Sequence, residues 1–287
     1  MKDTVRDEYL QSLHSRLPAR VYLDQEEIRP RDLQCIGAGR TGVVYRLDSK
    51  RAVKIYRETV DFSKLRWLQG YDFRKLPVPC AYPRRILQDA SGREVGYSSD
   101  YIAGQPFLRE AFGGHSVRAA HVRRLQSLAQ ILEILHGDDI ALGDFSNGNF
   151  LASGPTLGIV DVDGWSGPSH RSYWHDEAVD PLYDARRQAG LLPANDTYAL
   201  AHVLCRVLTK LSPYAGLYRG WDEPTRALRG KSIFEPETTK PPGYANLHRQ
   251  LPANVRSYFR AVFGHKVRVL PDETFWKELT NWVNSQD

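Results

Sequence analysis

A glycine-rich segment between two β-type segments constrains the fold of this chain more than any other feature. Its glycines are Gly37, Gly39 and Gly42. In a dinucleotide-binding fold such glycines lead into a helix, whose N-terminus meets the pyrophosphate. Here they lead into the β-branched and aromatic segment GVVYRL, a polar DSKR turn and AVKIY. The pattern over residues 32–56 therefore predicts a strand, a glycine turn and two further strands. Glycines at such a turn let backbone N–H groups approach phosphates, although an ordinary hairpin with turn glycines is the alternative.

Lys54 lies inside the apolar segment AVKIY. A lysine in such a strand is costly to bury unless its ammonium group meets an anion. Its separation from the glycines favours a contact with phosphate. The alternative is a lysine on an edge strand that points into solvent.

A second polar group follows the segment HVRRLQSLAQILEILHG, whose apolar spacing predicts a helix over 121–137. The segments GDFSNGNFL and GIVDVDG then place Asp144, Asn149 and Asp161 in loops beside two strands. One carboxylate can orient an attacking hydroxyl. The amide and the other carboxylate can hold Mg²⁺, which prefers oxygen ligands. Because Asp, Asn and Gly are also common turn residues, simple turn chemistry is the alternative interpretation.

The chain changes character after residue 115. Before it we expect roughly five strands, since segments 84–87 and 95–102 add to those above, and a short helix over 63–73. The other expected elements are an amphipathic helix over 4–17, a linker over 103–106, helices over 195–211, 254–263 and 272–283, and long loops over 165–195 and much of 215–250.

Composition and charge exclude several other classes of protein. Lys and Arg exceed Asp and Glu by 39 − 34 = 5, and their short clusters are isolated, so we expect no nucleic-acid partner. Three scattered cysteines form no CxxC pair, and the histidine spacings fit no standard zinc site. The first residues lack the apolar run of a signal peptide, and no stretch approaches the ~20 apolar residues of a membrane helix. We expect a cytoplasmic protein without a membrane partner, or an injected effector without a cleaved signal.

Taken in order, these segments resemble the protein-kinase superfamily. IGAGRTGVVYRL is similar to its glycine-rich loop, AVKIY to its lysine strand, GDFSNGNFL to its catalytic loop and IVDVDGW to its metal-binding strand end. Asp196 resembles the buried aspartate of the family's central helix, SPYAG the turn after it, and Arg268 its late arginine. The details look most similar to bacterial kinase-like domains associated with helix-hairpin-helix, von Willebrand-type and metal-dependent phosphatase proteins. The resemblance covers about residues 30–280.

The resemblance implies an α+β, two-lobed protein-kinase-like fold with a β-rich N-lobe and a mainly helical C-lobe. The implied boundaries are an N-terminal helical extension and lead-in strand over 1–30, an N-lobe over 31–104 and a C-lobe over 105–287. It also implies ATP and Mg²⁺ as cofactors, and a protein substrate or regulatory partner.

The same resemblance assigns roles to individual residues. Asp144 would be the catalytic base, and Asn149 and Asp161 would be the metal ligands. Asp163 stands at the glycine position of the family's metal motif and is the competing ligand. Lys54 would pair with the α- and β-phosphates. The implied ATP-binding residues are Ile36, Gly37, Gly39, Gly42, Val44, Ala52, Lys54 and the backbone at Asp100, Tyr101 and Ile102.

The catalytic segment departs from the family pattern. Leu142 and Gly143 replace the His-Arg pair before the catalytic aspartate, which argues against activation by a phosphorylated loop. Ser146 stands where many kinases carry a lysine that steadies the transferred phosphate. No APE-like motif follows the metal strand.

The glutamate that should pair with Lys54 from a helix is also missing. Glu58 is too near the lysine, and the next glutamate is Glu94. Asp72 has a suitable spacing but is an aspartate.

Three functions therefore stay open. The first is an ATP- and Mg²⁺-dependent kinase for Ser or Thr of a protein. The second is a nucleotide-binding pseudokinase that acts as a scaffold or regulator, which the missing glutamate and Ser146 favour. The third is a small-molecule kinase of the aminoglycoside or choline type. In those enzymes the catalytic loop usually has histidines at the positions that Leu142 and Ser146 occupy here.

Overall fold

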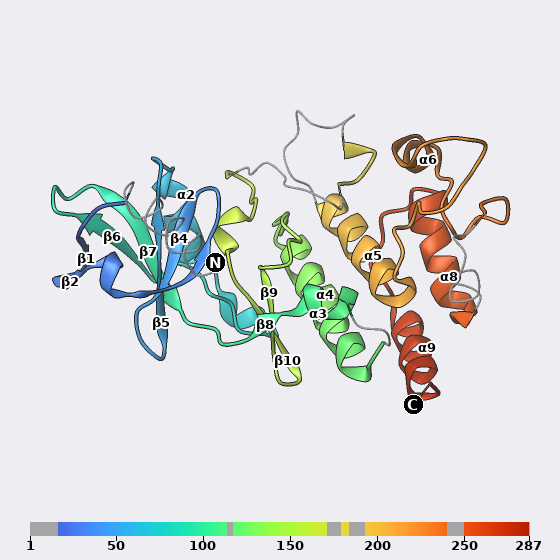
Figure 1. The fold of residues 1–287 in the computed structure, drawn as a ribbon, viewed down its shortest axis with the longest axis horizontal. Helices are drawn as coiled ribbons and strands as arrows, with labels where there is room; N and C mark the ends of the chain where they lie inside the picture. Colours follow the sequence, from blue (N-terminus) through green and yellow to red (C-terminus); the bar gives the residue numbers. More distant parts are fainter. Residues whose placement is uncertain (1–16, 114–116, 171–178, 184–192, 240–249, 287) are drawn as a thin grey trace, which may run out of the picture. The chain divides into compact units, whose positions relative to one another are not determined.

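The computed structural model divides the chain into two compact units (Figure 1). It describes residues 17–113, 117–170, 179–183, 193–239 and 250–286. The first unit comprises Met1–Phe73, Cys80–Ala103 and Val160–Asp163, and the second comprises Arg74–Pro79, Gly104–Ile159 and Gly164–Asp287. The short segment Val160–Asp163 thus belongs to the first unit although the chain on both sides of it belongs to the second.

The first unit is built on an antiparallel sheet of seven strands in the order β2-β1-β6-β7-β5-β4-β3. The strands are β1 (Val21–Leu23), β2 (Glu26–Ile28), β3 (Gln34–Ala38), β4 (Gly42–Arg46), β5 (Arg51–Tyr56), β6 (Arg85–Asp89) and β7 (Glu94–Asp100). The helix α2 (Phe62–Gly70) follows β5, and short 3-10 turns occupy Pro30–Asp32 and Phe73–Lys75.

The register of the central strands sorts their side chains onto two faces. In β4 and β5, Val43 lies opposite Ile55 and Tyr45 lies opposite Val53, and all four side chains are buried. The alternate residues of the same strands, which include Lys54, face the other way because side chains alternate along a strand. The apolar set forms the core, so the lysine is placed on the second face of the sheet.

Helix α2 begins where the side chain of Asp61 accepts a hydrogen bond from the backbone N–H of Ser63, at 2.9 Å. Such N-terminal caps satisfy one of the unpaired N–H groups of the first turn. The helix buries Phe62, Leu65 and Leu68, which repeat at helical spacing.

The second unit is mainly helical (Figure 1). Its helices are α3 (Phe107–Gly113), α4 (Ala119–Gly137), α5 (Pro193–Thr209), α6 (Glu223–Arg229), α8 (Ala253–Phe259), a π-helical turn (Arg260–Gly264) and α9 (Glu273–Asn284). A small antiparallel sheet, in the order β10-β9-β8, consists of β8 (Gln105–Pro106), β9 (Phe150–Ser153) and β10 (Thr156–Ile159). The 3-10 turn that follows β10 (Val162–Gly164) belongs to the first unit up to Asp163 and to the second from Gly164.

Helix α4 packs against both α5 and α9, and these contacts form the centre of the helical core. Nearly all of α5 is buried, which agrees with its continuous apolar run.

Arg268 donates two hydrogen bonds to the carboxylate of Asp180, Nε to Oδ2 at 2.7 Å and one terminal nitrogen to Oδ1 at 2.6 Å. The Asp180 side chain is buried, and that of Arg268 is only 11% exposed. The sequence singles out Arg268 but not its partner, because Asp180 lies 88 residues earlier in a segment predicted as a loop.

The structure confirms an α+β chain with a curled antiparallel sheet first and helices afterwards. The expectation of five strands in the first hundred residues was too low, because β1 and β2 form an additional hairpin. Each of these strands is only three residues long, so neither shows a period-2 pattern that can be read from sequence. The expected helix over 4–17 lies almost entirely outside the described residues.

Two other expectations need correction. The expected linker over 103–106 contains β8, which pairs with β9. The expected loop over 215–250 contains helix α6, capped by Asp222 at its start and by Gly230, with φ +66°, at its end. Within the described parts of the chain, no helix is both long and apolar enough to cross a membrane.

Candidate functional site

Lys54 lies in the middle of β5, between two neighbouring strands. Its Cα is opposite Val44 of β4 on one side and Tyr97 of β7 on the other. Only 8% of the lysine side chain is exposed. A buried ammonium group requires anionic partners, and the structure supplies two.

Both partners come from the segment after β10, more than one hundred residues later. Nζ of Lys54 donates to Oδ1 and Oδ2 of Asp163 at 2.9 and 2.8 Å, and also to Oδ1 of Asp161. These residues all belong to the first unit. The structure therefore brings together the lysine and the two acids that the sequence singled out.

Asp163 is held by two tyrosines as well as by the lysine. The hydroxyl of Tyr56 donates to Oδ2 at 2.6 Å, and that of Tyr97 donates to Oδ1 at 3.0 Å. Only 10% of the Asp163 side chain is exposed. Burial by itself would raise the pKa of this carboxyl, but the charge of Lys54 and the hydrogen bonds it receives hold its pKa below the usual range.

Asp161 has a different environment. Its backbone adopts a left-handed conformation, with φ +63°, just after β10. Its side chain is 41% exposed, and Lys54 donates to only one of its oxygens. Desolvation and the neighbouring charge of Asp163 raise the pKa of Asp161.

The glycine segment forms the expected turn between β3 and β4. The N–H of Gly39 donates to the carbonyl of Gly42 at 2.9 Å. A Cβ at Gly42 would lie 2.6 Å from the carbonyl oxygen of Ile55, so the fold itself requires glycine there. A Cβ at Gly39 would meet nothing within 4 Å, and one at Gly37 would make only ordinary contacts. Hairpin packing therefore explains the third glycine but not the first two.

The residues expected to enclose adenine share the face of Lys54. Val44 is directly opposite the lysine, and Ala52 precedes it by two positions. Ile36 lies at a bulge in β3 and is exposed.

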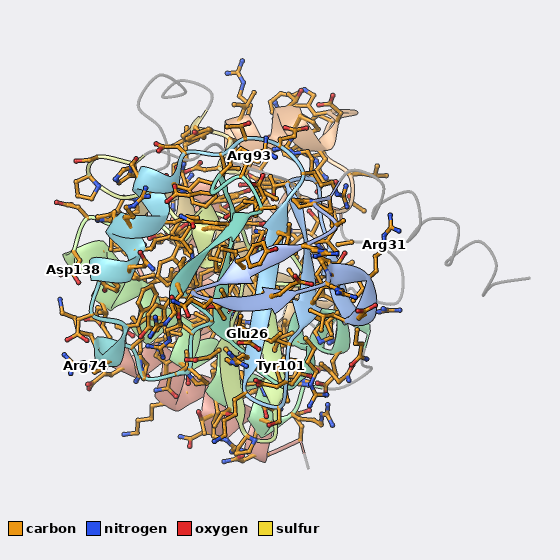
Figure 2. All side chains as sticks on the ribbon, turned by 90° about the vertical axis from the view of Figure 1, so that its left-hand side faces the viewer. Glu26, Arg31, Arg74, Arg93, Tyr101 and Asp138 are labelled. Carbon is orange, nitrogen blue, oxygen red and sulfur yellow. The ribbon has the colours of Figure 1, made fainter. Side chains whose placement is uncertain are left out.

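The expected hinge follows β7. Tyr101, labelled in Figure 2, donates its N–H to the carbonyl of Lys50 at 2.7 Å, and the guanidinium of Arg46 lies 4.5 Å from its ring centroid. The carboxylate of Asp100 pairs with Arg84 at 2.5 Å. Among the described residues, the N–H of Ile102 donates to no other group of the protein.

The second unit contains the other expected polar residues. The side-chain amide of Asn149 donates to the backbone carbonyl of Asp144 at 3.2 Å. The N–H of Ser146 donates to the Asp144 carboxylate at 2.9 Å. Asn149 is buried and Asp144 is partly exposed. The segment between them is thus a closed loop that fixes one relative to the other.

Asp196 of α5 anchors the start of this loop. Its carboxylate accepts hydrogen bonds from the N–H of Leu142 at 2.6 Å and of Gly143 at 2.8 Å. Nε2 of His136, at the end of α4, lies 3.3 Å from the same carboxylate. Asp196 has no exposed surface. A buried charge that receives backbone N–H donors is well stabilised, so the helix holds the loop in one conformation.

The expected site residues therefore form two groups, Lys54 with Asp161 and Asp163 in the first unit, and Asp144 with Asn149 in the second. Sequence reasoning missed Tyr56 and Tyr97. Tyr56 could have been found, because it follows Lys54 by two positions and so shares its face of the strand. Tyr97 requires the pairing of β5 with β7, which the sequence does not specify.

The described residues contain no cluster of three His, Cys, Asp or Glu side chains that could hold a metal.

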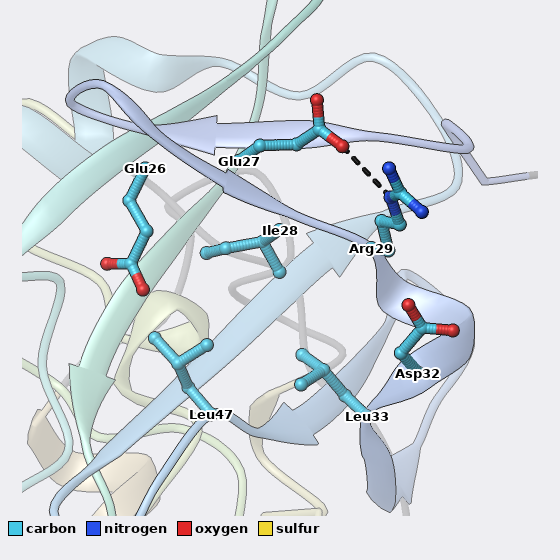
Figure 3. A pocket seen from close by; sticks show the side chains of 7 residues that line it. All are labelled: Glu26, Glu27, Ile28, Arg29, Asp32, Leu33 and Leu47. Carbon is cyan, nitrogen blue, oxygen red and sulfur yellow. Dashed lines mark hydrogen bonds and ion pairs between the residues drawn. The ribbon is translucent and has the colours of Figure 1, made fainter.

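A separate pocket in the first unit does not suit a nucleotide (Figure 3). Its polar side chains are Glu26, Glu27, Asp32 and Arg29, and the arginine already pairs with Glu27 at 2.9 Å. The carboxylates would repel a triphosphate.

A scan of protein-family models found none that matches this chain, and no curated protein matches it either.

Proposed function

We propose that this chain has a protein-kinase-like fold and is an ATP- and Mg²⁺-dependent phosphotransferase that acts on Ser or Thr hydroxyls of a protein. The observation that carries the proposal is the contact of Lys54 in β5 with Asp161 and Asp163 after β10. In this contact an ammonium group that would bind phosphates lies next to a carboxylate that would bind a metal. The strand that carries the lysine is paired with β4, which follows the glycine turn.

The energetics of this cluster favour a function over a purely structural role. Taking ammonium and carboxylate groups out of water costs several kcal/mol per ion, and a buried ion pair is often no more stable than an apolar replacement. A chain that keeps two carboxylates around one buried lysine gains little stability from it. Mg²⁺ bound to a triphosphate supplies the complementary charges, cationic for the acids and anionic for the lysine.

The side chains present fit a magnesium ion. Asp161 is partly exposed and has an oxygen that receives no hydrogen bond from Lys54. Asn149 uses its amide N–H₂ group as a donor to the loop, which leaves its carbonyl oxygen as a ligand. Both are the hard oxygen ligands that Mg²⁺ prefers. These roles for Asn149 and Asp161 come from the sequence resemblance, since the two residues belong to different units.

The remaining roles follow the same reasoning. Asp144 would accept the proton of the acceptor hydroxyl. Gly37 and Gly39 would let the turn approach the phosphates, since hairpin packing does not require glycine at either position. Val44 and Ala52 would contact adenine from the face that also carries Lys54.

A transfer assay with [γ-³²P]ATP, Mg²⁺ and both protein and small-molecule acceptors tests the proposal. We expect transfer to protein hydroxyls, and Asp144→Ala should lower it by about 10²- to 10⁴-fold while ATP binding persists. Asp139→Asn is the matched control, because Asp139 is exposed and asparagine tolerates its φ of +56°.

The other outcomes identify the alternatives. Transfer only to small molecules indicates a small-molecule kinase. ATP binding without any transfer indicates a pseudokinase, the function that Ser146 favours by replacing the phosphate-steadying lysine. Absence of ATP binding contradicts the proposal as a whole.

A further inference from the structure

The two acids that contact Lys54 differ in how completely their oxygens are used. Each oxygen of Asp163 receives two donors, one from Lys54 and one from a tyrosine, Tyr56 on Oδ2 and Tyr97 on Oδ1. A carboxylate offers about four lone-pair sites. The carboxylate of Asp163 is therefore saturated by the protein, and it is also almost completely buried.

Asp161 is far less constrained. Lys54 donates to one of its two oxygens, and neither tyrosine that holds Asp163 donates to it. The side chain is 41% exposed, against 10% for Asp163. A metal ion can reach Asp161 without breaking a network of hydrogen bonds, whereas at Asp163 it would have to displace four.

We propose that the two acids have separate tasks: Asp163 is a positioning residue that holds the ammonium group of Lys54, and Asp161 is the carboxylate that binds the metal. This inference rests on the proposed function. It assigns to Asp163 the pairing with Lys54 that the resemblance gives to a helix glutamate. Between β5 and β7 the sequence offers only Glu58, which is too near the lysine.

The donor count of the lysine explains how such a division works. An ammonium group has three N–H donors. The two oxygens of Asp163 lie too close together to receive separate N–H groups of one ammonium, so a single N–H is shared between them and a second is directed to Asp161. The third N–H is left for a phosphate oxygen, and a metal on Asp161 would leave a second one, while the contact with both oxygens of Asp163 keeps Nζ in place.

The tyrosines make the holding residue rigid. Tyr56 lies on the same strand as Lys54, and Tyr97 lies directly opposite the lysine on β7. Asp163, although it follows β10, is thereby fixed to the strand pair that carries Lys54. A long flexible side chain such as lysine binds a ligand better when it is preorganised, because less rotamer freedom is lost on binding.

The first test measures ATP binding by the full chain with and without Mg²⁺. We expect Mg²⁺ to tighten ATP binding by about 10-fold in the wild type, which corresponds to about 1.4 kcal/mol of binding free energy. Asp161→Asn should abolish the Mg²⁺ effect. Asp163→Asn should keep the Mg²⁺ effect but weaken binding about 10-fold in both conditions. The inference is overturned if Asp163→Asn abolishes the Mg²⁺ effect and Asp161→Asn preserves it.

A double-mutant cycle with Lys54→Met tests whether Asp163 acts through the lysine. Asp163→Asn should change ATP binding less than about 2-fold in the Lys54→Met background, since coupled residues are not additive. Asp161→Asn should still remove the Mg²⁺ effect in that background. An undiminished effect of Asp163→Asn without Lys54 would contradict a positioning role.

A third readout needs no nucleotide. In the free protein, the rate at which acetic anhydride acetylates Lys54 can be followed site by site with mass spectrometry. Asp163→Asn removes the charge of the more buried carboxylate, which contacts Nζ through both of its oxygens, so we expect about 10-fold faster acetylation of Lys54, and a smaller increase for Asp161→Asn. Tyr97→Phe, which deletes one hydroxyl, is the milder variant in case Asp163→Asn does not fold. Equal rates in wild type and all variants would refute the inference.

The matched control is Asp24→Asn, which breaks an exposed ion pair with Arg85 in the same unit at a backbone φ of +56°. It should leave the acetylation of Lys54 unchanged. If the wild type binds no ATP, the proposed function fails, but the acetylation rates still decide whether Asp163 holds Lys54.

Discussion

Replacement of Asp196 by asparagine should destabilise the second unit and release the loop that precedes Asp144. The buried carboxylate accepts N–H groups from Leu142 and Gly143 at 2.6 and 2.8 Å. An asparagine has one acceptor oxygen and one N–H₂ group, so it can accept from one of these amides and must present a donor to the other.

The expected loss follows from those two contacts. A hydrogen bond to a charged group contributes about 1.5–3 kcal/mol, a neutral one about 1 kcal/mol, and a buried unpaired donor costs about 1–3 kcal/mol. Weakening one bond and orphaning the other amide should therefore lower the free energy of unfolding by about 3 kcal/mol. With a urea m-value of ~3 kcal/mol/M, the unfolding midpoint should fall by about 1 M.

Urea unfolding followed by tryptophan fluorescence suits this test, because five of the six tryptophans are in the second unit. Hydrogen exchange should also show lost protection at the amides of Leu142 and Gly143. Asp272→Asn is the matched control: Asp272 caps α9 by accepting from Phe275 N–H at 2.8 Å, and asparagine caps equally well. A change below ~0.5 kcal/mol at Asp196, or unchanged exchange at both amides, would refute the reasoning.

Three further perturbations test the packing and the buried charges. Gly96→Ala should destabilise the sheet by about 1–3 kcal/mol in urea unfolding, because its Cβ would lie 2.1 Å from the carbonyl oxygen of Lys54. Arg268→Met should cost about 3–5 kcal/mol by leaving the buried Asp180 unpaired, and adding Asp180→Asn should recover part of the loss. Burial, with a smaller contribution from the charge of Arg206, lowers the pKa of His202 to about 4. Below pH ~6.5 the unfolded state therefore binds more protons than the folded state. The free energy of unfolding should fall by up to ~3 kcal/mol as the pH is lowered from ~6.5 to ~4. His202→Gln should flatten this pH dependence.

Each of these predictions has its own control and contrary result. Gly39→Ala, where a Cβ meets nothing within 4 Å, should be nearly neutral, and equal effects at Gly39 and Gly96 would contradict the packing argument. His265→Gln, at an exposed histidine, should leave the pH dependence intact. If the double variant at Arg268 and Asp180 is no more stable than Arg268→Met alone, the unpaired carboxylate is not the source of the loss.

The elements with long, regular patterns could be predicted from the sequence. Helix α4 follows its apolar spacing, and β4 and β5 follow the β-branched runs on either side of a polar turn. The hairpin of β1 and β2 could not be predicted, because strands of three residues with adjacent glutamates at Glu26 and Glu27 carry no periodic signal.

The site was less accessible to sequence reasoning than the fold. The order of the segments indicates that Lys54, Asp161 and Asp163 belong to one site, but it does not say which acid the lysine contacts. The resemblance predicts a partner for Lys54 in the region before Glu94, whereas the contacts are to residues 107 and 109 positions after the lysine. Only the paired strands show that two tyrosine hydroxyls complete the network.

The most direct test of the central claim is a crystal structure of the full chain with a non-hydrolysable ATP analogue and Mn²⁺, in which anomalous scattering locates the metal. We expect the metal about 2.1 Å from a carboxylate oxygen of Asp161, with Asp163 still hydrogen-bonded to Lys54, and Nζ of the lysine on a phosphate oxygen. A metal bound to Asp163 with Lys54 detached from it would contradict the division of tasks. A nucleotide bound far from Lys54, or none at all, would contradict the proposed function.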